Sequence, residues 1–337
     1  MVKVTIREVA RAAGVSVATV SRVLNDSGPV NGNTKQRVRD AAGSLRYVPH
    51  GGAQSLIKRR TSTLGVLLPD LYGEFFSEVL RGIDFAAKRS GYHMLVSGSH
   101  DDRDEIVAAM RAMRGRVDGL VIMSPDIDAA ALIANIPDSL PVVLLNCAVS
   151  DGGYDSINID NVGGAQNMVR HLVSHGHTRI AIITGAERNL DARERLRGYR
   201  AALRAEGLTH TARWELTGDF TEDSGHAAAR RLLKLRPRPT AIFAANDAMA
   251  VGAISALRDA FVNVPDEIAV AGFDDIPIAR HVSPALSSVH VPIAELGEKA
   301  IGKLLRAVVE KEKYVRRQDV LRTTLVIRNS CGAPGHV

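Results

Sequence analysis

Hydrophobic residues recur at helical spacing in two short stretches near the N-terminus, with a turn between them. The first stretch begins at Thr5, which has capping-box spacing to Glu8, and ends at Gly14. The second follows Ser16, a residue type favoured at helix N-caps. The inner faces would be formed by Ile6, Val9, Ala10 and Ala13 in the first stretch and by Val20, Val23 and Leu24 in the second, with Val17, Ala18, Ser21 and Arg22 facing outward. This pattern predicts a helix-turn-helix, although a plain helical hairpin would show the same spacing.

A third helical pattern would complete a small all-α module over residues 1–49. Val38, Ala41, Ala42 and Leu45 recur at i, i+3, i+4 and i+7, and Pro49 marks the end. Residues 50–62 then form a short basic segment. Because Gly51-Gly52 disfavours a helix, this segment is either a flexible linker or a hinge helix that forms only when bound to a partner.

From Thr63 onward, short apolar runs alternate with helical patterns. The runs are typical of strands covered on both faces, so the expected fold is α/β with parallel, doubly wound sheets. They occupy residues 64–68, 93–97, 119–123, 142–145, 180–183, 240–243 and 268–271. Residues 81–92 also resemble residues 197–208, and each copy would be the first helix after the first strand of a lobe. Two similar lobes predict a cleft between them, bordered by strand C-terminal ends.

The charge distribution favours nucleic acid as the partner of the N-terminal module. Residues 1–62 contain eleven Lys and Arg against three Asp and Glu, a net charge of +8, whereas the remainder of this chain of net charge +6 carries −2. A solvated face would mix the two signs, but a phosphate-binding surface requires such an excess. The charge therefore favours the helix-turn-helix over the plain hairpin.

Other classes of protein find less support in the sequence. No apolar run approaches the ~18 residues of a membrane span, and the N-terminus lacks the apolar centre of a signal peptide, so a cytoplasmic location is expected. Cys147 and Cys331 have no metal-ligand spacing and are expected to be thiols without function. The pair Asp274-Asp275 alone is weak support for acid/base or metal chemistry. A sugar-binding transport protein, an α/β enzyme and a non-specific nucleoid protein remain as alternatives.

Several motifs resemble the LacI/GalR-type bacterial transcriptional repressors, from about Val4 to Arg328. They are Val15-Ser-Val-Ala-Thr-Val-Ser-Arg-Val-Leu-Asn25, Tyr47-Val-Pro49, Ala53-Gln-Ser-Leu56, Ala245-Asn246-Asp247 and Gly272-Phe-Asp-Asp275. The resemblance implies a helix-turn-helix headpiece, a hinge helix, and a two-lobed core like the periplasmic sugar-binding proteins, with three crossings between lobes. It implies an N-lobe of residues 63–160 plus 292–318, a C-lobe of 161–291 plus 319–329, and a tail of 330–337.

For DNA, the resemblance places Val17, Ala18 and Arg22 at base-contacting positions. Arg22 can contact guanine with two hydrogen bonds, whereas the two apolar residues can only contact groups such as a thymine methyl. Short polar residues suited to phosphate contacts are Thr5, Ser16, Thr19, Ser21, Asn25 and Thr34. Leu56, with Ala53 beside it, matches the hinge leucine that wedges into the minor groove, although it could simply pack on the core. His50-Gly51-Gly52 departs from the family's usual Asn-centred hinge start.

For the effector, the resemblance carries over residues that follow strand C-terminal ends. They are Asp70, Tyr72, Phe75, Phe76, Ser124, Asn146, Arg195, Phe220, Asn246 and Asp274. Aromatic faces with carboxylate, amide and guanidinium groups suit a polyhydroxylated ring. Simpler roles stay open: Phe75 or Phe76 in the core, Asp160 and Asn246 as helix N-caps, and Arg193 or Arg197 as surface charges.

The sequence therefore predicts a homodimeric repressor of carbohydrate-utilisation genes that reads a pseudo-palindromic operator. A sugar-like effector between the lobes would control its affinity for DNA. The tail has no heptads to build a tetramer. No catalysis, metal or cofactor is expected.

Overall fold

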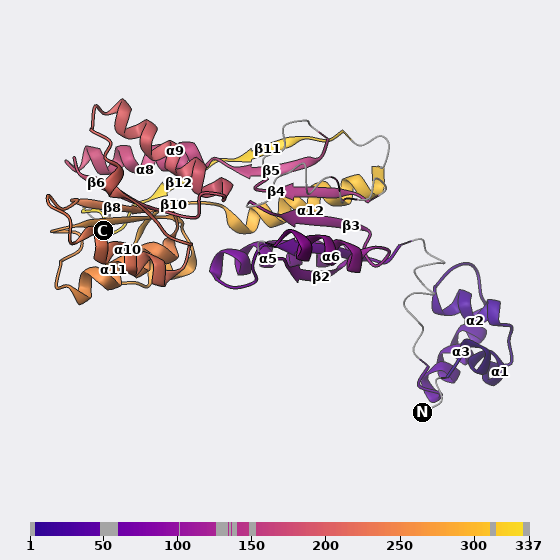
Figure 1. The fold of residues 1–337 in the computed structure, drawn as a ribbon. Helices are drawn as coiled ribbons and strands as arrows, with labels where there is room; N and C mark the ends of the chain where they lie inside the picture. Colours follow the sequence, from indigo (N-terminus) through magenta and orange to yellow (C-terminus); the bar gives the residue numbers. More distant parts are fainter. Residues whose placement is uncertain are drawn as a thin grey trace. The chain divides into compact units, whose positions relative to one another are not determined.

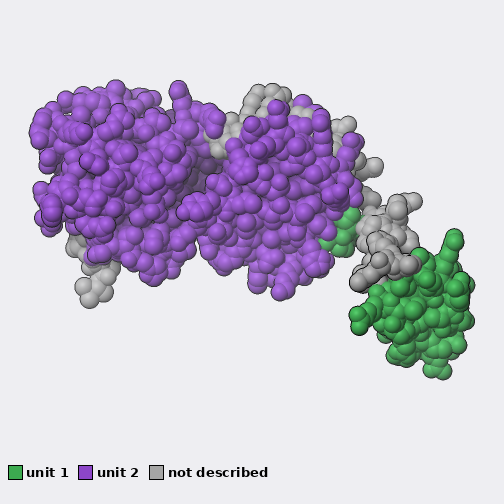
Figure 2. All heavy atoms as spheres, turned by 60° about the horizontal axis from the view of Figure 1, so that its bottom comes forward, with its two compact units in different colours: residues 1–62 green, residues 63–337 purple. Residues whose placement is uncertain are grey.

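The chain divides into two compact units, Met1–Ser62 and Thr63–Val337 (Figure 2). The computed structural model describes residues 4–47, 60–100, 102–125, 134, 136, 140–147, 153–310 and 315–332. Within these residues, no helix combines the length and the apolar character needed to cross a bilayer.

Three helices around one small core build the first unit. They are α1 (Ile6–Ala13), α2 (Val17–Leu24) and α3 (Gly32–Ser44). Val9, Val20 and Val38, one from each helix, are fully buried at the centre, whereas the predicted core residues Ile6, Leu24 and Leu45 are only partly buried. Gly14 ends α1 in the left-handed conformation, with φ 64°. The predicted helix-turn-helix and third helix are thus confirmed.

Each lobe of the second unit contains one six-stranded sheet (Figure 1). The first has the order β11-β5-β4-β3-β1-β2, and the second β12-β10-β9-β8-β6-β7. The strands of the first sheet are β1 (Thr63–Leu68), β2 (His93–Gly98), β3 (Gly119–Met123), β4 (Val142–Leu145), β5 (Asp155–Ile159) and β11 (Gln318–Leu321). Those of the second are β6 (Ile180–Thr184), β7 (Glu215–Thr217), β8 (Ala241–Ala244), β9 (Ala269–Asp274), β10 (Ser287–His290) and β12 (Thr324–Val326). Strand pairing is parallel except between β10 and β12, which confirms the predicted sheet type.

Helices cover both faces of each sheet. The N-lobe has α5 (Glu74–Arg89), α6 (Arg103–Met113) and α12 (Ile293–Glu310); the C-lobe has α8 (Asn161–Ser174), α9 (Leu190–Ala205), α10 (Glu222–Leu232) and α11 (Asp247–Asp259), with short 3-10 turns at Ala212–Trp214 and Pro277–Arg280. Along β6, Ile180 and Ile182 join the core beneath α8 and α9, whereas Ala181 and Ile183 join the core beneath α10 and α11. This alternation is why β6 is apolar at every position from Ile180 to Ile183.

The internal repeat corresponds to the same close helix–helix contact in both lobes. A Cβ atom at Gly82 of α5 would lie 2.0 Å from the Ala294 carbonyl oxygen of α12, and one at Gly198 of α9 would lie 2.5 Å from the Val162 carbonyl oxygen of α8. Glycine at each position therefore lets one helix cross closely over the first turn of its neighbour.

Two predicted boundaries are wrong. Residues 319–321 belong to β11, which pairs with β5 of the first sheet, so the last crossing falls between Leu321 and Thr324 and not after residue 318. The predicted tail also begins too early, because Ser330 and Cys331 are fully buried. The Ser330 hydroxyl donates to the Val270 carbonyl at 2.6 Å and anchors this segment to β9.

Candidate functional site

The outer face of α2 carries exposed side chains above a buried inner face. Val17, Ala18 and Arg22 are exposed, while Val20 and Val23 are buried, as predicted. Ser16 Oγ accepts a hydrogen bond from Thr19 N at 3.1 Å and caps the helix. Among the described residues, Arg22 has no ion-pair partner, so its guanidinium is available to a ligand outside the headpiece.

The other polar residues of the headpiece differ in how free they are. Thr5 is engaged by Glu8, whose Oε2 accepts from Thr5 N at 2.7 Å and from Thr5 Oγ1 at 2.9 Å, and these hydrogen bonds lower the pKa of Glu8. Asn25 Nδ2 donates to Ser21 Oγ at 3.2 Å. Thr19, Ser21 and Thr34 are half-buried. Ala53 and Leu56 lie outside the described residues.

In the second unit, Arg195 of α9 is the centre of a buried polar cluster. Its Nη2 lies 3.0 Å from Asp274 Oδ1 at the end of β9, and its Nη1 donates to the Ala245 carbonyl at 2.5 Å. Its guanidinium carbon lies 3.8 Å from the centre of the Phe273 ring. Because the guanidinium nitrogens and one of its faces have protein partners, Arg195 fixes the ends of β8 and β9 relative to α9.

Asp274 is held as a strained, buried carboxylate. Its φ is 104°, in the region that favours glycine. Burial raises the pKa of Asp274 to about 6, although the Arg195 charge opposes this shift, and the negative charge of Asp191 adds to it. Next to a polar ligand, a carboxylate buried in this way would be a strong hydrogen-bond acceptor.

The cluster spans both lobes through Asn146 at the end of β4. Its Nδ2 donates to Asp191 Oδ2 of α9 at 3.1 Å, while its buried Oδ1 has no hydrogen-bond partner among the described residues. Asn161 connects the two halves, since its Nδ2 donates to Asp191 Oδ1 at 2.8 Å and its Oδ1 accepts from Arg195 Nε at 2.9 Å. We call Asn146, Asn161, Asp191, Arg195 and Asp274 the interlobe cluster.

Asn161 and Asp191 are not among the residues predicted from the sequence. Asp191 lies four residues before Arg195, so helical spacing puts both on one face of α9, and this signal could have identified it. Asn161 follows the predicted cap Asp160, which indeed accepts from Gly163 N at 2.9 Å. Nothing in the local pattern distinguishes Asn161 from a helix surface residue.

The remaining predicted effector residues differ in burial and in their hydrogen-bond partners. Asn246 caps α11 by accepting from Met249 N at 2.9 Å, which confirms the simpler role. Phe75 and Phe76 pack edge-to-face with ring centres 5.5 Å apart and contact the core. Tyr72 is 85% exposed, and Asp70 Oδ1 accepts from Tyr72 N at 3.0 Å. Ser124 is buried, and Phe220, with φ 69°, is half-buried.

Two motifs of the sequence meet behind the cluster. Asp247 Oδ2 accepts from Ile276 N at 2.9 Å and Oδ1 from Ser288 Oγ at 2.6 Å, and burial raises its pKa well above the usual range. A Cβ atom at Gly272 would lie 2.1 Å from Asp247 Oδ1. Asp275 pairs with Arg328 at 2.7 Å. These groups shape the loop after β9 and are fully occupied by protein partners.

Two further hydrogen bonds join the lobes. Leu190 N donates to the Pro125 carbonyl at 2.9 Å, and Ile278 N donates to Glu74 Oε2 at 2.8 Å.

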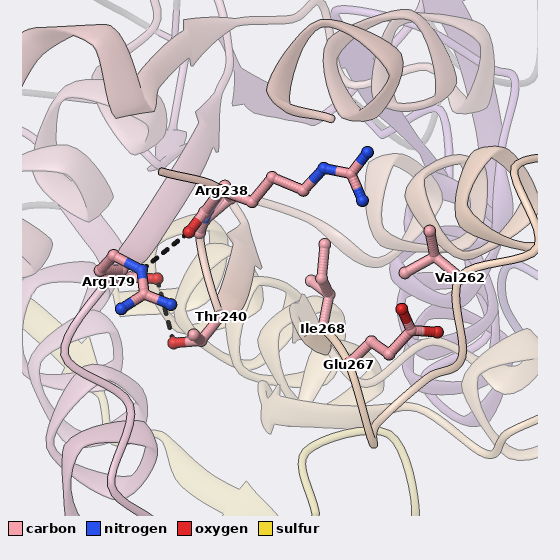
Figure 3. Close-up of a pocket in the computed structure, with 7 residues that line it drawn as sticks. Arg179, Arg238, Thr240, Val262, Glu267 and Ile268 are labelled. Atoms are coloured by element: carbon pink, nitrogen blue, oxygen red, sulfur yellow. Dashed lines mark hydrogen bonds between the residues drawn. The ribbon is translucent and has the colours of Figure 1, made fainter. Parts of the chain in front are cut away.

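A cavity of about 140 Å³ lies at the opposite ends of the C-lobe strands, lined by Arg179, Arg238, Pro239, Thr240, Val262, Glu267 and Ile268 (Figure 3). It contains no predicted effector residue. Within the described ranges, no three His, Cys, Asp or Glu side chains are arranged to hold a metal ion.

Comparisons with known proteins agree with this geometry. Residues 5–50 match the family described as bacterial regulatory proteins, lacI family, and residues 169–331 match the periplasmic binding protein-like domain. The chain is 37% identical to the ribose operon repressor of Escherichia coli over 91% of its own length and 93% of that protein. It is 35% identical to the regulator GalR of Escherichia coli, covering 98% of this chain and 96% of that one.

Solved structures agree over the same extent. The lac repressor dimer bound to operator and an anti-inducer superimposes with a TM-score of 0.87 at 29% identity, covering 97% of this chain and 99% of that one. The regulator CelR in complex with cellobiose superimposes with a TM-score of 0.74 at 32% identity over the same shares of the two chains. With a headpiece and a two-lobed core in the same order as these proteins, the chain belongs to the lacI family of bacterial regulatory proteins and is a DNA-binding transcriptional regulator.

Proposed function

We propose that the protein is a homodimeric repressor of carbohydrate-utilisation genes that releases its operator when a sugar-like effector binds between the lobes. The interlobe cluster carries this proposal, because Asn146 of one lobe and Asp191, Arg195 and Asp274 of the other meet in one buried hydrogen-bonded network. A ligand that exchanges partners with this network changes the relative free energies of the lobe arrangements.

The dimer and its location follow from the DNA-binding role. A two-fold dimer presents two α2 helices to a pseudo-palindromic operator, and such a protein acts in the cytoplasm, where the chromosome is. Phe85 of α5 and Leu95 of β2 are exposed large hydrophobic residues on the N-lobe, which supports burial against a second copy. Leu56 would wedge into the operator centre, with Ala53 beside it.

The test uses the full-length protein and an operator selected from random oligonucleotides. We expect sequence-specific binding that weakens with salt, and release on addition of one member of a panel of sugars, sugar acids and nucleosides. That ligand should also raise the melting temperature of the wild type but not of Arg195→Ala. Leu56→Ala should reduce operator bending in a phasing assay. Salt-insensitive or sequence-independent binding would contradict the proposal and favour the alternative functions.

A further inference from the structure

A second cavity lies at the junction of the lobes, beside residues 158–162 of the first crossing. It has a volume of about 290 Å³, near the lower end of small-molecule sites. One wall is formed by Asn158 of β5 and Val320 of β11, and the other by Leu190, Glu194 and Arg197 of α9. We call it the hinge notch. Because its walls belong to different lobes, any lobe movement changes its width.

The hinge notch is distinct from the interlobe cluster but shares one residue with it. Along α9, Asp191 and Arg195 contact the cluster, while residues at positions i, i+4 and i+7 from Leu190 line the notch. Asn161 belongs to both, since it binds Asp191 and Arg195 and its Nδ2 also lies 3.3 Å from Glu194 Oε2. A ligand in the notch would therefore act on the cluster through Asn161 and α9.

The lining chemistry indicates which ligand the notch would take. Asp160 and Glu194 give it two carboxylates, and its single cation Arg197 is already close to Glu194 Oε1, at 3.4 Å. The Asn158 amide oxygen has no hydrogen-bond partner among the described residues. Asp160 Oδ1 already accepts from Gly163 N and Glu194 Oε2 from Asn161 Nδ2, so the acceptors that the notch offers are the remaining positions on these carboxylates and the Asn158 oxygen. They lie beside the apolar side chains of Leu190 and Val320. A molecule with several hydroxyl donors and one apolar face matches this surface.

We propose that the hinge notch is a second binding site, for a small polyhydroxylated molecule, whose occupancy is coupled to the interlobe cluster. The proposal does not require the first site to bind sugar. A ligand in the notch would give the protein a second way, besides a ligand at the interlobe cluster, to influence the movement of the lobes.

The experiment uses the full-length wild-type protein, in which Asn161 keeps its partners, and substitutions in the notch separate binding there from binding at the interlobe cluster. Saturation-transfer NMR titrations use glycerol, D-ribose and D-glucose as probes. At least one should bind, and adding Val320→Trp, which fills the notch, should weaken its binding at least tenfold. Val315→Trp is the matched control, because Val315 is similarly exposed but does not line the notch. Glu194→Gln, which keeps the size of the side chain, should weaken binding in the same direction.

Three results would overturn the proposal. One is no binding of any probe to the wild-type protein. Another is binding that Val320→Trp and Val315→Trp affect equally. The third uses putrescine as a diamine probe: if it binds in a Val320→Trp-sensitive manner and the polyols do not, the notch is an amine site instead. Operator binding, measured separately, tests the proposed repressor function independently of these outcomes.

Discussion

The outer face of α2 and the interlobe cluster are built in opposite ways. Val17 and Arg22 stand exposed on a helix whose inner face is buried, within one continuous stretch of chain. Asn146, Arg195 and Asp274 come from distant parts of the sequence and are each almost fully buried. DNA can therefore reach the first set without any change in the protein, whereas a ligand reaches the second only inside the core, where most of the polar groups already have protein partners.

On the outer face of α2, a substitution can change binding without changing stability, whereas in the interlobe cluster a substitution changes both. An exposed side chain without partners can be removed with little effect on folding. A buried charge cannot, because its partner is left in a medium of low polarity without compensation. If the effector binds at the interlobe cluster as proposed, its recognition is tied to the free energy of folding of the core, whereas the proposed base recognition by α2 is not.

The largest expected effect is that of Arg195→Ala. It leaves Asp274 buried without its ion pair and removes the hydrogen bond to the Ala245 carbonyl, so we expect a loss of about 3–5 kcal/mol in the free energy of unfolding. Arg204→Ala, at an exposed position on the same helix, should cost only about 0.5 kcal/mol. Urea denaturation measures both. Equal losses for the two variants would contradict the special role of the cluster.

Asp274 should also give the core a characteristic dependence on pH. Its pKa is raised from 3.8 to about 6, so its protonated form favours folding: this stability is fully present below pH ~4 and is lost as the pH rises through 6. The total is about 3 kcal/mol, at 1.36 kcal/mol per pKa unit. The free energy of unfolding of the wild type should therefore fall relative to that of Asp274→Asn between pH 4 and 6. Parallel curves would show that Asp274 does not titrate in this range.

The same contrast explains what could be predicted from the sequence. The headpiece depends on spacing within single helices, so Ser16, Val20 and Arg22 are placed correctly from local pattern alone. Strands made of a continuous apolar run are equally clear. The inner strands β5 and β10 are missed although they are buried, because their sequences Asp155–Ile159 and Ser287–His290 contain polar residues and show no apolar run. The edge strand β11 is missed because three of its four positions are exposed or partly exposed.

The interlobe cluster, the candidate effector site, could be predicted only in part, because its contacts are long-range. Arg195 and Asp274 follow from motifs, and their ion pair places them together. Asn246 has the same motif support, yet its side chain is used as a helix cap. Asp191 could have been found from its helical spacing to Arg195, but its contact with Asn146, which lies 45 residues away on the other lobe, could not. No periodicity within either segment reports that contact.

On the exposed side of the comparison, Arg22→Ala should change recognition without changing stability. The loss of a two-hydrogen-bond contact to guanine costs about 1–3 kcal/mol of operator binding and relaxes the preference at one base pair. Oligonucleotide selection at fixed salt measures both effects, and denaturation should show no more than about 0.5 kcal/mol of change. If the preference is relaxed at every position instead, Arg22 contacts phosphate and not a base.

Ser16 should affect both stability and DNA binding, because it caps α2 and is also predicted to contact the DNA phosphates. Ser16→Ala removes the acceptor for Thr19 N and should cost the headpiece about 1 kcal/mol, seen as faster amide exchange in α2. Ser16→Asp keeps an acceptor at the N-cap, so exchange should stay slow, but its negative charge would repel the DNA backbone and weaken operator binding at low salt. A Ser16→Asp protein that binds operator as well as the wild type would remove Ser16 from the phosphate contacts and leave it only the cap.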